Sequence, residues 1–136
     1  MAEPWRTMGA VEFAGRDGPR FVFRETGGPA RLLITLLEPG IVRVQVQPLG
    51  HATVARTWAV VGNAGETGPE GRDREDLSVF SCPEPLATSV SDGMFHLRDH
   101  GFHLSLDLAS AALSVALEDG SPLLTDHGRN AYRSSR

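Results

Sequence analysis

Three histidines stand close together in the sequence and are the first candidates for chemistry. His96, His100 and His103 lie within eight residues. The alternation of apolar and polar residues around them predicts a hairpin in which His96 and His103 share the polar face of two adjacent strands with Ser105 and Asp107. Two imidazoles on adjacent strands can bind a metal ion if a carboxylate supplies a third ligand.

Other features near these histidines argue against a metal site. In the same register Arg98 lies directly opposite His103, and its positive charge disfavours a cation. The sequence contains neither H-x-H nor H-E-x-x-H, the spacings that place two imidazoles on one ion. We therefore expect no metal and no cofactor, and a polar sheet face that is solvated or faces a partner. A platform for a polar ligand is the alternative.

The chain lacks the other arrangements that commonly carry catalysis. It contains no Lys and therefore no phosphate-binding G-x-x-x-x-G-K-[ST] loop, and no G-x-S-x-G nucleophile motif. Five of the 17 acidic residues lie between 62 and 76, where no predicted element would hold two carboxylates at a fixed separation. Cys82 stands beside Pro83 without a recognisable histidine partner, so we expect a small apolar filler rather than a nucleophile.

Length and composition restrict the class of protein. The 136 residues carry a formal net charge of −4 and one cysteine, which predicts a single domain over 1–136 without an internal disulfide. A (β/α)₈ barrel needs about 250 residues. Mild acidity argues against a nucleic-acid groove, and no apolar run approaches the ~18 residues of a membrane span. Because the first residues do not resemble a signal peptide, we expect a cytoplasmic protein that binds neither nucleic acid nor membrane.

The apolar residues recur mostly with a period of two, which predicts strands. The 15 Gly and nine Pro imply many short elements. Arg31–Leu37 is nearly all apolar, as in a strand buried on both faces, whereas 62–76 has no apolar periodicity and is predicted to be a long exposed loop, with a lid or binding loop as the alternative. Pro83 and Pro85 exclude a central strand at 83–85. The other strands are expected in Gly9–Ala14, Arg20–Glu25, Ile41–Gln47 and Val54–Val61.

Two hairpins are predicted in the second half of the chain. A two-residue loop at His100-Gly101 pairs Leu97 with Leu104 and Phe95 with Leu106 on one buried face. A type I′ turn at Asp119-Gly120 pairs Val115 with Leu124 and Leu117 with Pro122. A helix over Leu104–Leu117 is the alternative to these strands, because apolar residues also recur there three or four apart. With the strands, the whole chain is predicted to be an all-β, antiparallel β-sandwich.

Three stretches carry a resemblance to a known family. They are IVRVQV at Ile41–Val46, TWAVV at Thr57–Val61, and the tail LSLDLASAALSVALEDGSPLLTDHGRNAY at Leu104–Tyr132. From Ala30 to Tyr132 the order of features resembles the N-terminal domain of glycoside hydrolase family 31, the α-glucosidase and α-xylosidase family. That domain is a β-sandwich of the galactose-mutarotase-like supersandwich type, and it precedes a catalytic barrel.

The resemblance implies a non-catalytic module that packs on the barrel of an α-glycosidase and helps to shape its carbohydrate-binding cleft. The catalytic aspartates of the family belong to the barrel, so no catalytic residue is carried over and we expect the chain alone to be inactive. The tail over 126–136 leads toward that missing domain, which makes Asp126, Arg129 and Tyr132 candidate substrate-binding residues. Alternatively, Asp126 caps a turn and Tyr132 anchors the tail.

A severed module would expose the surface that met the barrel. We expect that surface near Leu123–Tyr132, and we expect the isolated chain to self-associate through it. The alternative function is a free-standing carbohydrate-binding or protein-interaction β-sandwich. A lectin-like site would need exposed aromatic rings for sugar stacking, and the alternation around Trp58 is typical of a core residue.

Overall fold

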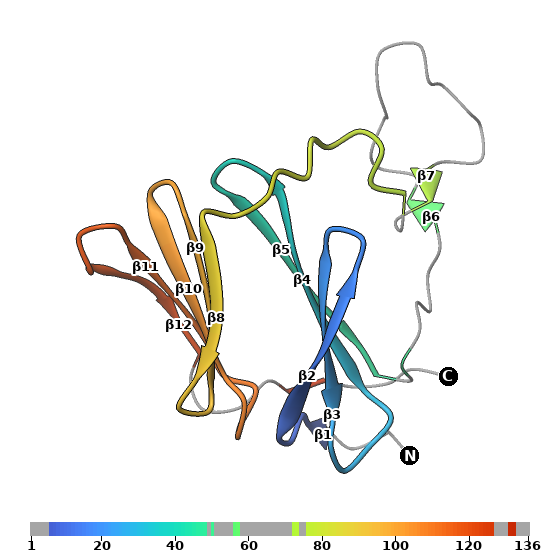
Figure 1. Ribbon diagram of the computed structural model, residues 1–136. Coiled ribbons are helices and arrows are strands. Elements are labelled where there is room, and N and C mark those ends of the chain that lie inside the picture. Colours follow the sequence, from blue (N-terminus) through green and yellow to red (C-terminus); the bar gives the residue numbers. More distant parts are fainter. Residues whose placement is uncertain are drawn as a thin grey trace.

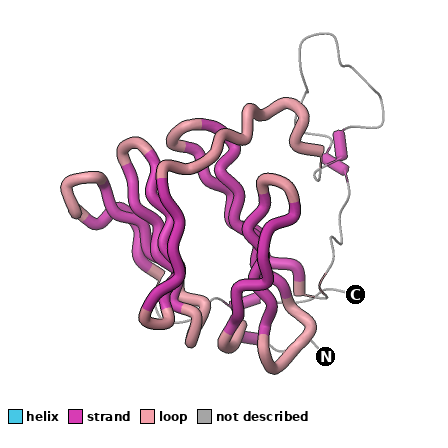
Figure 2. The backbone as a smooth tube through the Cα atoms, in the orientation of Figure 1, coloured by secondary structure: helices cyan, strands magenta, loops and turns pink. Residues whose placement is uncertain are grey.

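A computed structural model of the protein describes residues 6–48, 50, 56–57, 72–73, 76–126 and 131–132. In this part of the chain every regular element is a β-strand (Figure 1 and Figure 2), so none of its elements is a helix that could span a membrane. Two antiparallel sheets of four and five strands face each other as a β-sandwich, as predicted.

The four-stranded sheet has the order β2-β3-β4-β5 and the five-stranded sheet the order β12-β11-β10-β9-β8. Each sheet is therefore built from strands that follow one another along the chain. The first sheet consists of β2 (Val11–Asp17), β3 (Arg20–Glu25), β4 (Arg31–Glu38) and β5 (Ile41–Gln47). The second consists of β8 (Ala87–Ser91), β9 (Met94–Asp99), β10 (Phe102–Asp107), β11 (Leu113–Leu117) and β12 (Pro122–Thr125).

Two further pairs of strands are short. β1 (Arg6–Thr7) pairs with β13 (Ala131–Tyr132), and β6 (Arg56–Thr57) pairs with β7 (Arg72–Asp73). β6 lies inside the strand expected at Val54–Val61, and β7 lies inside the loop expected at 62–76. Most of both predicted segments lies outside the described residues.

The core lies between the two sheets and is centred on aromatic rings. Phe95 of β9 stacks on Phe13 of β2, with ring centroids 5.8 Å apart, and meets the ring edge of Phe23 at 4.9 Å. Offset and edge contacts of this kind stabilise a core beyond the area they bury. The largest fully buried side chains are Phe23, Phe95, Met8, Leu32, Ile34, Leu36, Leu97, Leu104 and Leu106.

β4 is buried on both faces, as its continuous apolar sequence predicted. Leu32, Ile34 and Leu36 belong to the core between the sheets. Leu33 and Thr35, which point the other way, are only 2% and 3% exposed. On β5, Val42 and Val46 pack against the core, whereas Val44 is 38% exposed.

The predicted register of the first hairpin is confirmed. Leu104 pairs with Leu97 and Leu106 with Phe95 across β9 and β10, and all four side chains are buried. Because β10 and β11 are antiparallel strands, the helix over Leu104–Leu117 is excluded.

The second hairpin corrects the prediction in part. Val115 pairs with Leu124, as expected, but Pro122 pairs with Ala116 rather than with Leu117. The amide of Gly120 donates to the carbonyl of Leu117 (2.9 Å), and Gly120 has a φ of +91° whereas Asp119 lacks a positive φ. The loop is therefore a three-residue loop ending on a left-handed glycine, not a type I′ turn. A bulge between the Ala116–Pro122 pair and the Val115–Leu124 pair shifts the register, so that Val115 still pairs with Leu124.

The segment between β7 and β8 crosses from one sheet to the other along one end of the sandwich (Figure 1). The amide of Cys82 donates to the carbonyl of Leu37 (2.9 Å), and the amide and hydroxyl of Ser81 both donate to the Glu38 carboxylate. These contacts tie the segment to the end of β4. In agreement with its prolines, the segment contains no strand from 76 to 86.

Candidate interaction surface

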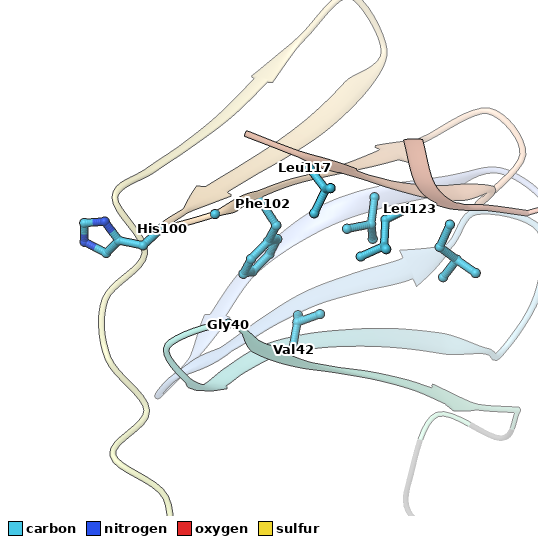
Figure 3. A pocket seen from close by; sticks show the side chains of 9 residues that line it. Gly40, Val42, His100, Phe102, Leu117 and Leu123 are labelled. Atoms are coloured by element: carbon cyan, nitrogen blue, oxygen red, sulfur yellow. The ribbon is translucent and has the colours of Figure 1, made fainter. Parts of the chain in front are cut away.

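One side of the sandwich is open. β5 and β12 are the edge strands of their sheets, and an apolar cavity of about 370 Å³ lies between them. Figure 3 shows Phe102, Leu117 and Leu123 pointing from the five-stranded sheet toward Val42 of the other, while His100 points away. The cavity is lined by Gly40, Val42, His100, Gly101, Phe102, Val115, Leu117, Leu123 and Leu124.

Large apolar side chains are exposed around this cavity. Leu123 and Leu124 of β12 are 64% and 54% exposed, and Leu117 is 42% exposed. On β5, Ile41 and Val44 are also exposed. Such a group of neighbouring apolar side chains is typical of a surface that another molecule or domain covers. We refer to these five residues as the open side.

The edge strand β12 is protected less than the edge strand β2: it is short, begins with Pro122 and pairs across a bulge, but it has no charged side chain. The sequence Pro-Leu-Leu-Thr carries no charge, whereas the edge strand β2 carries Glu12, Arg16 and Asp17 and is bent by a bulge next to Gly15. Charges and bulges prevent an edge from pairing with a further strand. β12 is therefore suited to contact with a partner.

The three predicted substrate-binding residues have different outcomes. The carboxylate of Asp126 accepts a hydrogen bond from the amide of Leu113 (2.9 Å), and its own amide donates to the carbonyl of Leu113 (2.9 Å). This side chain closes the β11–β12 ladder. The backbone of Tyr132 pairs with Arg6, its side chain is not described, and Arg129 lies outside the described residues. A role for any of them in substrate binding remains a prediction.

The histidine face is arranged as the sequence indicated. Arg98 pairs with His103 and Ser105 with His96, and Nδ1 of His96 lies 3.1 Å from Nε2 of His103. Partial burial, then His96 and then Arg98, lowers the pKa of His103 below its ordinary value of 6.5. The Asp107 carboxylate, which shares this face, accepts the amide of Ala109 (2.9 Å). The described residues include no group of three or more metal-ligating side chains.

Aromatic rings suited to sugar stacking are scarce in the described part of the chain. The exposed ones there are Phe13 and Phe80, at 38% and 37%, and the ring of Phe13 already stacks on Phe95. The open side itself was only partly anticipated. Leu123 and Leu124 both line one cavity next to the bulge of the β11–β12 pair, which the period-two pattern of a regular strand does not predict.

Comparison with known proteins supports the fold alone. No known family's sequence model and no curated protein sequence matches the chain. The structure is similar to part of the uncharacterized protein lmo2446 from Listeria monocytogenes EGD-e, solved in complex with α-D-glucose, β-D-glucose, magnesium and calcium. The TM-score is 0.57 at 13% sequence identity, over 91% of this chain and 10% of that one. The chain thus spans about a tenth of the length of the protein it resembles, and what the two share is an antiparallel β-sandwich.

Proposed function

We propose that this chain is the non-catalytic N-terminal β-sandwich module of a larger carbohydrate-active enzyme of the glycoside hydrolase family 31 type. The observation that carries the proposal is that its fold recurs as about a tenth of a much longer protein solved with bound glucose. The order of strand motifs along the chain, which resembles that family's N-terminal domain, supports the same assignment.

The open side is the surface that we assign to contact with the catalytic barrel. It joins exposed leucines of β12 to exposed residues of β5 around a cavity with a mainly apolar lining. Contact between domains is stabilised by burying such area. Asp126 follows β12 directly, and in the proposed parent enzyme we place it beside the carbohydrate cleft.

Two of the described carboxylates, those of Glu38 and Glu84, are poor candidates for the general acid of a glycosidase. Retaining glycosidases need one carboxylic acid and one carboxylate about 5 Å apart. The Ser81 hydroxyl and amide lower the pKa of Glu38, and the bidentate contact with Arg16 lowers the pKa of Glu84. Neither group is suited to remain protonated at neutral pH and act as the general acid.

An activity assay tests this part of the proposal. We expect the purified chain not to hydrolyse p-nitrophenyl α-glucoside or α-xyloside above the buffer rate. Turnover that disappears on substitution of a single acidic residue of this chain, such as Glu38→Gln, would overturn the proposal.

A sugar titration separates the module from a free-standing carbohydrate-binding sandwich. Backbone amide shifts of the chain are followed by NMR while glucose or maltose is added to millimolar concentration. We expect no saturable, localised change, because the proposed module contacts sugar only together with the barrel. Saturable shifts confined to one patch of the isolated chain would favour the free-standing alternative.

A further inference from the structure

The pair formed by His96 and His103 is not used in the proposed function. It lies on the outer face of the five-stranded sheet, away from the core. The two residues are diagonal neighbours on β9 and β10, because His96 pairs with Ser105 and His103 with Arg98. Both are partly buried, so the sheet restricts the positions of their rings more than it does at the exposed His100.

The separation of the two ring nitrogens matches that of two ligands on one metal ion. Nδ1 of His96 and Nε2 of His103 are 3.1 Å apart. Nitrogens bound at 2.0–2.1 Å lie roughly 2.9 Å apart at a right angle and roughly 3.4 Å apart at a tetrahedral angle. The observed distance falls between these values.

Each ring nitrogen must present a lone pair to bind a metal ion. In the hydrogen-bonded pair, one nitrogen carries the shared proton and the other accepts it. When an ion binds, the protonated ring moves its proton to its other nitrogen, so two neutral imidazoles bind without net loss of a proton.

The surroundings leave room for the remaining ligands. Three of the four residues paired with His96 and His103 from the neighbouring strands are small, namely Ser89, Ser105 and Ala116, and the fourth is Arg98. The Ser105 hydroxyl lies 3.3 Å from Nδ1 of His96, and a cavity of about 330 Å³ opens beside His103. Water can complete the coordination of an ion there.

Three charged groups line the cavity beside His103, namely Arg98, Asp99 and Glu118. Asp99 is buried, and its carboxylate lies 3.5 Å from the amide of Gly40. The guanidinium of Arg98 weakens cation binding, and the carboxylate of Glu118 favours it. Arg98 pairs directly with His103. Its charge therefore makes the site weaker than two imidazoles alone would be.

We propose that His96 and His103 form a binding site for a divalent transition-metal ion of the class that prefers imidazole, namely Zn²⁺, Ni²⁺ or Cu²⁺. Nδ1 of His96 and Nε2 of His103 are the two protein ligands, and water supplies the others. The site is independent of the open side and of any barrel. Hard ions such as Mg²⁺ prefer oxygen ligands and do not bind it.

Calorimetric titration of the chain with Zn²⁺ or Ni²⁺ at pH 7.5 tests the site. We expect saturable binding that weakens roughly tenfold or more, about 1.4 kcal/mol, in both His96→Ala and His103→Ala. His100→Ala, which removes an exposed histidine of the same hairpin, is the matched control and should bind as the wild type does. Arg98→Gln should tighten binding, and Mg²⁺ should give no binding heat.

A second readout covers the possibility that a variant alters the fold. Zn²⁺ should raise the unfolding midpoint of the wild type and of His100→Ala, and it should not raise that of His96→Gln or His103→Gln, whose midpoints without metal are measured alongside. Absence of saturable binding to the wild type overturns the proposal. Equal affinity in the wild type and the His96 and His103 variants also overturns it, because other groups of the chain would then hold the ion.

Discussion

The packing of Leu104 offers the sharpest quantitative test of the fold. Leu104 is completely buried in the middle of β10, and it pairs with Leu97 on one side and Val115 on the other. Leu104→Ala removes most of a side chain whose burial is worth about 1.5–3 kcal/mol. The flanking strands are fixed by their ladders, so a cavity remains and the expected loss of unfolding free energy is about 2–5 kcal/mol.

The matched control makes the same chemical change at the open side. Leu123 is 64% exposed, so Leu123→Ala should cost less than about 1 kcal/mol. Urea unfolding followed by far-UV circular dichroism measures both losses as shifts in midpoint at unchanged m-value. For a chain of this size the Leu104 variant should also unfold roughly 6–20 °C lower. Equal losses at the two positions would refute either the register of β10 or the exposure of β12.

Three further predictions concern other parts of the chain. The pKa of His103 is lowered in the folded state, so the imidazole is protonated in the unfolded chain at a higher pH than in the folded chain. The stability that the neutral imidazole preserves is fully present above about pH 6.5 and is lost as the pH falls toward the folded pKa. Between pH 7.5 and 5.5, His103→Asn should therefore lose less stability than the wild type in urea unfolding. Gly93→Ala should cost about 1–2 kcal/mol because Gly93 has a φ of +72°, whereas Gly27→Ala, with ordinary φ and open space, should be neutral or slightly stabilising by thermal unfolding. In sedimentation velocity the wild type should form dimers or larger species at high concentration; Leu124→Glu should abolish them and Val90→Glu, on the opposite edge, should not, and a wild type that stays monomeric would contradict this expectation.

The regular strands were predictable because burial forces a period of two. Arg20–Glu25 and Ile41–Gln47 were expected with the bounds that the structure has. β8 was missed because all five of its residues are exposed, so no apolar face marks it. Its turn at Asp92-Gly93, where both residues have positive φ, is the Asp-Gly signal of a type I′ turn, which was instead assigned to Asp119-Gly120.

The candidate sites depend on information that no local pattern holds. The open side requires β5 and β12 to lie at the same side of two different sheets, which is a property of the sandwich and not of either strand. The hairpin register that makes His96 and His103 neighbours was predictable from the sequence. The orientations of the two rings, which bring their nitrogens into contact, were not. The Asp126 carboxylate accepts the amide of Leu113 at the end of the β11–β12 ladder, whereas the structural alternative from the sequence was that it caps a turn.

The most direct test of the account is to sequence the genomic DNA immediately downstream of the codons for this chain. The account predicts an in-frame or adjacent coding region for a (β/α)₈ barrel, with alternating strands and helices and two aspartates in position to act as nucleophile and acid/base. Co-expression of that barrel should then protect the amides of Leu123 and Leu124 from hydrogen exchange. A stop codon followed only by genes that encode no barrel would contradict the account.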